Sequence, residues 1–176
     1  MRGPDRGTVK AFFAVALMAC ALLPLAGLAV LALPLVSSLQ FYAGYPLRVV
    51  TAQLSTWLLC VGGWAAERSG ASMTVDGHLV LVDAPCSGVQ MAWMAYFCAC
   101  AICVFTAVDD GRWLRRLPWV GTIVLAGNAV RNSVLVALQV QGPVSETLHQ
   151  AIGLALLAVV CAAVVAVMHG GRHASA

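Results

Sequence analysis

The sequence has little charge and no cysteine pattern that would build a disulfide framework. Asp, Glu, Lys and Arg make up 10% of its 176 residues, whereas hydrophobic residues make up 61%. The mean hydropathy is +0.90. A soluble domain of this length could not bury so much apolar surface, so the composition predicts an integral membrane protein. The net charge of +3 does not indicate nucleic-acid binding, because the basic residues lie where membrane topology would place them.

The seven cysteines are an odd number without framework spacing. Six of them lie in apolar runs: Cys20, Cys60, Cys98, Cys100, Cys103 and Cys161. In such runs a cysteine is usually a small core residue. The three at positions 98, 100 and 103 do not share one helix face, because residues two apart point to nearly opposite sides. A closed zinc site also needs four ligands, so we expect no metal and no cofactor.

Four long apolar runs predict four membrane-spanning helices, since about 20 apolar residues cross a bilayer. The first covers residues 11–36 and is too long for a signal peptide, with no clean cleavage site. The other three cover about residues 87–108, 119–140 and 147–168. We expect residues 1–176 to form one membrane domain in which residues 87–168 make a three-span core.

A segment between the first two spans has a different pattern. After a connection at residues 37–45, Pro46 suits the first turn of a helix. Apolar residues then recur at helical spacing, with Arg48, Thr51 and Ser55 on the opposite face. This amphipathic pattern favours an interfacial helix at residues 46–66 over a full crossing.

Residues 72–82 change to a period of two around Asp76-Gly77. That pair favours a two-residue hairpin turn, so the segment predicts a small β-hairpin outside the hydrocarbon. The expected fold is therefore an all-α integral membrane protein with about four transmembrane helices, an interfacial amphipathic helix and a small extracytoplasmic β-hairpin.

The distribution of Lys and Arg predicts the orientation of this fold. Seven basic residues lie in the N-terminal head, in the loop at residues 109–118 and in the C-terminal tail. Two others, Arg48 and Arg68, lie on the other side. Because basic loops stay in the cytoplasm, both termini are expected there, and the hairpin is expected to face outward.

Cys86 differs from the other cysteines because it lies in a polar turn, Asp83-Ala84-Pro85-Cys86-Ser87-Gly88, at the outward mouth of the second span. A helix N-terminus favours a thiolate over a thiol, and the thiolate is the nucleophilic form. The alternative is an ordinary buried cysteine, which is a common case.

Arg131 lies inside the third span, about 12 Å from its outward end at 1.5 Å per residue. A charge at that depth costs at least a few kcal/mol by insertion scales and marks a functional candidate. Asn128 and Asn132 flank it and predict a polar stripe directed into the bundle. The alternative is a structural arginine that reaches toward the interface.

His149 opens the last span, and Glu146 lies three residues earlier on the same helix face, where it could orient the imidazole. By itself, such a histidine is more often an interfacial residue. Topology nevertheless places Cys86, Arg131 and His149 in the outer half of the bundle. Together they suit acyl transfer, in which a thiolate attacks a carbonyl, an imidazole moves the proton and a guanidinium stabilises negative charge.

These residues carry a family resemblance. Cys86-Ser87-Gly88 entering one span, Asn128-Ala129-Val130-Arg131 in the next and His149 opening the last resemble the exosortase/archaeosortase family, over roughly residues 37–168. The resemblance implies a membrane-embedded cysteine peptidase or transpeptidase that acts through a Cys86 acyl-enzyme at the outer membrane face. It also implies catalytic roles for Arg131 and His149. Supporting roles are expected for Asn128, Glu146, Ser87 and Gly88.

The implied partners are the lipid bilayer and a secreted protein substrate whose C-terminal sorting signal has a short motif, a transmembrane helix and a basic tail. No nucleic-acid partner is expected. The implied location is the inner or plasma membrane of a bacterium or archaeon. Many family members have additional spans before this core, and many have a small residue where Pro85 stands. These departures leave the subfamily and the substrate motif open.

Two other functions compete with this interpretation. Cys100-Ala101-Ile102-Cys103 has the C-x-x-C form of a membrane thiol oxidoreductase, although it lies toward the cytoplasmic half of its span. Such an enzyme needs cysteine pairs at the outer surface. A non-enzymatic assembly or accessory subunit could instead use Arg131 and His149 to pair with another protein. That function would not require a reactive Cys86.

Overall fold

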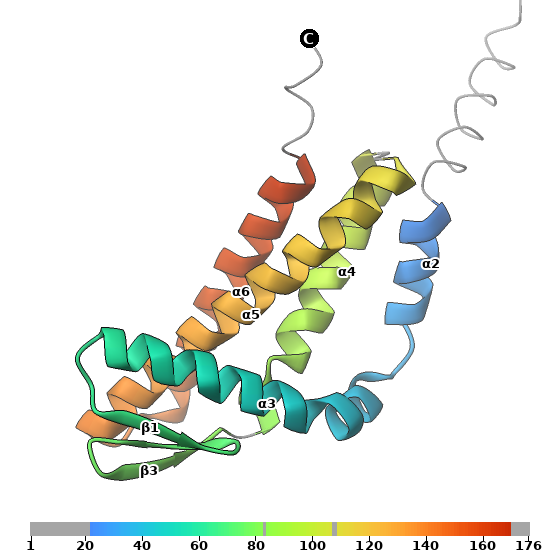
Figure 1. Cartoon of the computed structure of the whole chain (residues 1–176). Helices are drawn as coiled ribbons and strands as arrows, with labels where there is room; N and C mark the ends of the chain where they lie inside the picture. Colours follow the sequence, from blue (N-terminus) through green and yellow to red (C-terminus); the bar gives the residue numbers. More distant parts are fainter. Residues whose placement is uncertain (1–21, 83, 107–108, 170–176) are drawn as a thin grey trace, which may run out of the picture.

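The structure is a computed structural model that describes residues 22–82, 84–106 and 109–169. Figure 1 shows a mostly helical chain with a small sheet at one end. The helices are α2 (Leu22–Leu31), α3 (Val36–Val61), α4 (Val89–Thr106), α5 (Asp110–Gln141) and α6 (Glu146–His169). The strands are β1 (Ala66–Ser69), β2 (Ser72–Val75) and β3 (His78–Leu81), and a 3₁₀ turn, η1 (Ala84–Ser87), precedes α4.

Three helices, α4, α5 and α6, are each long and apolar enough to cross a membrane. Helices α2 and α3 together form a fourth candidate, bent by 92° where the chain turns between them. These helices confirm a multi-pass membrane protein with three or four candidate spans. Of the predicted first span, residues 11–36, the structure describes only residues 22–36, and it does not show one straight helix there. Helix α2 ends at Leu31 and the chain bends before α3, while residues 11–21 lie outside the described ranges.

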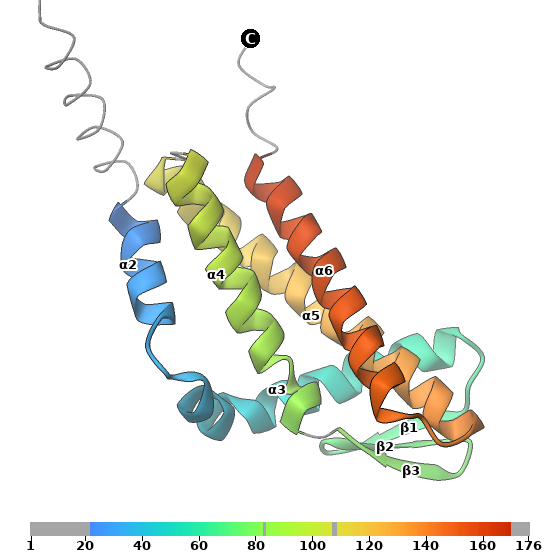
Figure 2. The ribbon, with the colours of Figure 1, turned by 180° about the vertical axis from the view of Figure 1, so that it is seen from behind.

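The helices α4, α5 and α6 lie side by side, and α2 packs against α4 (Figures 1 and 2). Their shared core contains Ala95, Ala99 and Val164, which are fully buried. At Gly27 a Cβ atom would lie 2.8 Å from the Cys100 Sγ atom, so α2 approaches α4 very closely there.

The prediction of a loop at residues 109–118 is wrong from Asp110 onward, because helix α5 begins at that residue. Asp109 caps this helix through its Oδ2 atom, which accepts a hydrogen bond from the Arg112 backbone N–H at 3.3 Å. Pro118 is accommodated inside α5. The arginines of this segment therefore lie on the first turns of a helix.

The predicted connection at residues 37–45 is also wrong, because α3 is continuous from Val36 to Val61 and contains Pro46 in its interior. Figure 1 shows α3 lying across the helical bundle at the end that carries the sheet. Its polar stripe does not face away from the protein. Thr51 and Ser55 are 1% and 0% exposed, whereas Trp57 is 61% exposed. The apolar periodicity predicted the helix correctly, but tertiary contacts with α5 bury its polar face.

The predicted hairpin at residues 72–82 is confirmed by β2 and β3, which pair antiparallel. Asp76 and Gly77 form the turn with φ values of 48° and 82°, which Asp tolerates better than most residues and Gly adopts without penalty. The sequence missed β1, which pairs with β2 to complete a three-stranded sheet. Its residues do not alternate apolar and polar, and Arg68 of β1 instead donates from Nε to Gln53 Oε1 on α3 at 2.8 Å.

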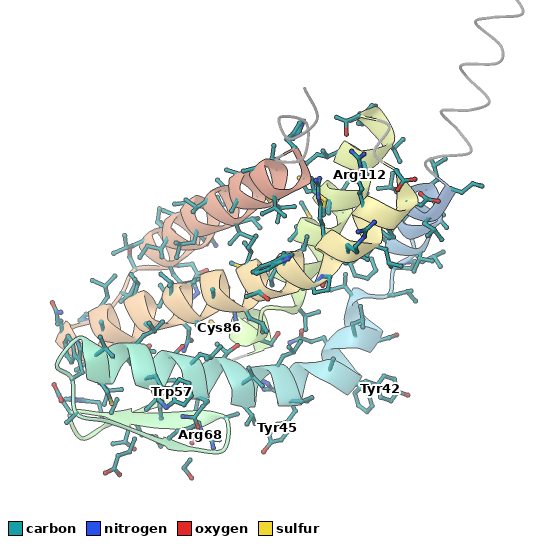
Figure 3. The ribbon with its side chains drawn as sticks, turned by 45° about the horizontal axis from the view of Figure 1, so that its top comes forward. Tyr42, Tyr45, Trp57, Arg68, Cys86 and Arg112 are labelled. Atoms are coloured by element: carbon teal, nitrogen blue, oxygen red, sulfur yellow. The ribbon has the colours of Figure 1, made fainter. Side chains whose placement is uncertain are left out.

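The sheet packs under α3 through a second apolar cluster, which includes Ala52, Met73 and Val75. Cys86 and Val136 belong to the same cluster. The sheet, the start of α4, the end of α5 and the start of α6 thus lie at one end of the bundle (Figure 2). Arg112 lies at the opposite end (Figure 3).

Candidate active site

Cys86 lies in the loop that enters α4, as its sequence position predicts. It is 8% exposed and belongs to η1, three residues before the first residue of α4. The Ser87 hydroxyl accepts a hydrogen bond from the Val89 N–H at 3.3 Å and donates one to Gln40 Oε1 of α3 at 3.0 Å. Ser87 thus satisfies a donor at the start of α4 and also links the cysteine loop to α3.

Asn128 of α5 holds the same loop from the other side. Its Nδ2 atom donates to the Cys86 carbonyl oxygen at 2.9 Å and to Thr51 Oγ1 at 3.0 Å. The Asn128 side chain is 1% exposed. A buried carbonyl without a donor is costly, so this side chain stabilises the backbone at Cys86.

Gly88 makes this contact possible for two reasons. Its φ of +85° lies in the left-handed region, where glycine has no steric penalty. A Cβ atom at this position would lie 2.8 Å from Asn128 Nδ2 and 3.0 Å from Asn128 Cγ. The sequence Cys86-Ser87-Gly88 therefore permits a tight turn and leaves room for the asparagine.

Arg131 lies one helical turn further along α5 and faces a different neighbour. A Cβ atom on Gly153 of α6 would lie 3.3 Å from Arg131 Nε and 3.4 Å from Nη2. The guanidinium therefore lies directly against the α6 backbone. The predicted single polar stripe is wrong in this respect, since Asn128 and Asn132 bond to α3 while Arg131 packs on α6.

His149 lies at the start of α6, four residues before Gly153 and so on the same helix face. Its side chain is half-buried. The expected Glu146–His149 hydrogen bond is absent from the described residues. Glu146 is exposed, and its Oε1 atom accepts a hydrogen bond from Gln150 Nε2 at 2.9 Å.

The structure thus brings the three predicted catalytic residues to one end of the bundle through a chain of contacts. The Cys86 backbone bonds to Asn128, one turn from Arg131 on α5. The Arg131 guanidinium then packs against α6, one turn from His149. In Figure 3, Cys86 lies between the ribbons of α3 and α5, and Arg112 lies at the far end.

The sequence interpretation missed the part that α3 plays in this site. Gln40 and Thr51 bond to the side chains that hold the cysteine loop, and Ser55 Oγ donates to the Ala129 carbonyl oxygen of α5 at 3.2 Å. The signal was the polar stripe on an otherwise apolar helix. The prediction of an interfacial helix did not indicate that this stripe contacts α5 and the cysteine loop.

A cavity of about 200 Å³ lies beside the cysteine loop, between α4 and α5. It is lined at one end by Ser87, Gly88 and Asn128, and it continues to Tyr96 and Gly121. A second hollow of about 450 Å³ lies between α3 and α5 and is lined largely by apolar side chains. Both hollows lie along α5 and share Leu125.

The C-x-x-C pair lies in a different place. Cys100 and Cys103 are 2% and 0% exposed, in the core of the bundle. Cys103 Sγ contacts Met168 Sδ at 3.8 Å near the end of α6, away from the sheet. This burial opposes the disulfide-generating alternative, which needs an accessible cysteine pair. Within the described ranges, no group of three or more His, Cys, Asp or Glu side chains is assembled for a metal ion.

Comparison with known families agrees with these observations. The chain matches the family model for transmembrane exosortases over residues 6–166. This range contains the cysteine loop, the arginine of α5 and the histidine of α6. No curated protein and no solved structure matches the chain.

Proposed function

Because the chain belongs to the transmembrane exosortase family, we propose that it is a membrane cysteine peptidase or transpeptidase. Its substrate is a secreted protein, and it removes the C-terminal sorting signal. The observation that carries this proposal is the cysteine loop itself. Cys86 stands before a membrane helix in a turn that two other helices hold by hydrogen bonds. A purely structural cysteine requires no such support.

In the proposed reaction, the Cys86 thiol loses its proton to His149 and its sulfur forms a bond to the scissile carbonyl carbon. The carbonyl oxygen becomes an oxyanion, which the Arg131 guanidinium stabilises. Collapse of this intermediate breaks the C–N bond, and His149 returns the proton to the leaving amine. A thioester on Cys86 remains, and water or an amine or hydroxyl acceptor then releases the product and regenerates the thiol.

The position of Arg131 supports this role. An arginine inside a membrane-spanning helix raises the free energy of insertion, so it usually has a partner or a function. Gly153 lets the guanidinium lie against α6 beside the turn that carries His149. Asn128, Ser87 and Gly88 keep their supporting roles in the proposal, because each shapes the loop. A supporting role for Glu146 has less support, because its side chain accepts a hydrogen bond from Gln150 and not from His149.

The proposed substrate lies with its C-terminal helix in the bilayer beside the bundle. The hollow between α3 and α5 is lined largely by apolar side chains, so it could receive an apolar side chain of such a segment. The scissile bond then lies near the sheet end of the bundle. Arg112, at the start of α5, lies at the opposite end (Figure 3), which by the positive-inside rule supports an outward orientation of the sheet and Cys86. We propose the inner or plasma membrane of a bacterium or archaeon as the location, with both termini in the cytoplasm.

The direct test is co-expression with a secreted protein that ends in a motif, a transmembrane helix and a basic tail. The expected result is loss of the C-terminal helix, measured by intact mass. Cys86→Ala is expected to abolish processing. Arg131→Lys is expected to lower it on the order of a hundredfold or more, because an ammonium lacks the planar fork of a guanidinium. Equal processing by Cys86→Ala and the parent would show that the assignment is wrong.

Orientation has a separate test. A membrane-impermeant thiol reagent, applied to intact cells and read by mass at each cysteine, is expected to label Cys86 slowly from outside. Labelling of Cys86 only after the cells are opened would contradict the proposed outward orientation. A Cys86 that stays inert in the folded protein, before and after the cells are opened, would favour the accessory-subunit alternative.

A further inference from the structure

The crossing helix α3 contributes two side chains that hold the cysteine loop, and neither belongs to the proposed catalytic group. We infer that Thr51 is a positioning residue for Cys86, which acts through Asn128, and that Gln40 plays the matching part through Ser87. This inference rests on the proposed function, because it assigns these residues to the same nucleophile. It makes α3 part of the proposed active site.

The Thr51 contact is buried and has a defined direction. Thr51 and Asn128 are each 1% exposed. The Asn128 amide has two N–H donors. One donates to the Cys86 carbonyl oxygen at 2.9 Å, and the same nitrogen lies 3.0 Å from Thr51 Oγ1. Two acceptors fix the plane of the amide. Loss of the Thr51 oxygen would leave a buried donor unsatisfied and would free the amide to turn away from Cys86.

The Cys86 carbonyl matters because it is part of the peptide that joins the cysteine to Ser87. Holding this peptide plane limits rotation of the backbone at Cys86 and so limits where its Sγ atom can lie. Gly88 follows with a φ of +85°, a conformation that places few other restraints on the turn. Besides the local hydrogen bond from the Val89 N–H to the Ser87 hydroxyl, the loop is therefore restrained by side chains of α3 and α5.

Gln40 and Thr51 are eleven residues apart, which is close to three helical turns, so they share one face of α3. Gln40 accepts a hydrogen bond from Ser87 at 3.0 Å, directly after the cysteine. Thr51 reaches the carbonyl of the cysteine through Asn128. One helix, α3, thus restrains the cysteine loop at two adjacent residues.

The test compares Thr51→Val with Thr51→Ser and Thr56→Val. Valine has nearly the shape of threonine but no hydroxyl, and serine keeps the hydroxyl. Thr56 is a matched control, because it is a buried threonine of the same helix whose hydroxyl bonds to the Ala52 carbonyl oxygen of its own helix at 2.8 Å. Thr51→Ala is included so that a smaller side chain is available if valine prevents folding.

Thr51→Val is expected to lower kcat for processing by about tenfold to a hundredfold, because a misplacement of about 1 Å can cost on the order of a hundredfold. KM is expected to stay unchanged, because Thr51 does not contact the substrate in this proposal. Thr51→Ser is expected to restore most of kcat, and Thr56→Val is expected to resemble the parent. Thermal unfolding in detergent, measured in parallel, reports any general loss of stability.

A second readout needs no substrate. The rate at which iodoacetamide alkylates Cys86, resolved by mass and measured across pH, is expected to change in Thr51→Val and to stay parental in Thr51→Ser and Thr56→Val. Identical kcat values and identical alkylation profiles for Thr51→Val and Thr56→Val would overturn the positioning role. A serine variant that fails to restore kcat would also overturn it. Absence of processing by the parent would instead refute the proposed function, and the alkylation profiles would still decide the role of Thr51.

Discussion

The conformation of Gly88 permits a quantitative prediction about the cysteine loop. Gly88→Ala places a methyl group at a φ of +85°, and the left-handed conformation costs a non-glycine residue about 1–2 kcal/mol. The same methyl group would lie 2.8 Å from Asn128 Nδ2, which is closer than real Cβ atoms approach. Asn128 is buried and cannot move without loss of a hydrogen bond, which costs a further 1–3 kcal/mol, roughly. The expected total is about 2–5 kcal/mol.

Gly63→Ala separates these two costs. Gly63 has a φ of +89°, close to that of Gly88, but a Cβ atom there would meet nothing within 4 Å. Its substitution therefore carries the backbone cost without the clash. We expect both variants to unfold at lower temperature than the parent in detergent, and Gly88→Ala to show the larger shift.

Processing of a co-expressed substrate distinguishes the two variants further. Gly63→Ala is expected to process at nearly the parental rate, because its cost lies outside the site. Gly88→Ala is expected to lose processing even at temperatures where it stays folded, because the methyl group displaces the side chain that holds the Cys86 carbonyl. If the two variants process equally well, Asn128 does not control the cysteine loop and the reasoning is refuted.

Three further substitutions test neighbouring parts of the structure, each by substrate processing and thermal unfolding. Gly153→Leu is expected to displace the Arg131 guanidinium, whose Nε would lie 3.3 Å from even a Cβ atom, and so to reduce processing more than unfolding temperature. Asn128→Asp is expected to abolish processing, because an ionised carboxylate has no donor for the Cys86 carbonyl. Cys103→Ala is expected to keep processing while lowering stability slightly, since it removes only a buried sulfur.

For each of these substitutions, one outcome would contradict the role that we assign to the residue. Parental processing by Gly153→Leu would mean that Arg131 acts without its close contact to α6. Parental processing by Asn128→Asp would show that the Cys86 carbonyl needs no side-chain donor. Loss of activity in a folded Cys103→Ala variant would revive the thiol oxidoreductase alternative. A matched glycine control is Gly142→Ala, where a Cβ atom would meet nothing within 4 Å.

The sequence alone determined the membrane class, the positions of α4 and α6 and the hairpin of β2 and β3. These features depend on local patterns: apolar length for the helices, and a period of two around a turn pair for the hairpin. It also predicted Cys86 at the entry to a helix and the opposite placement of Arg68 and Arg112. Both follow from the order of elements along the chain.

Only the tertiary structure determined which side chains and helices are in contact. The sequence predicted an interfacial helix and not the burial of its polar stripe, because an amphipathic pattern does not say which face meets the protein. The bonds from Thr51 to Asn128 and from Asn128 to Cys86 join residues 77 and 42 positions apart. The contact of Arg131 with Gly153 likewise depends on which side of α5 is covered by α6. Local periodicity sets a helix and its faces, but only packing in three dimensions selects the neighbour that each face receives.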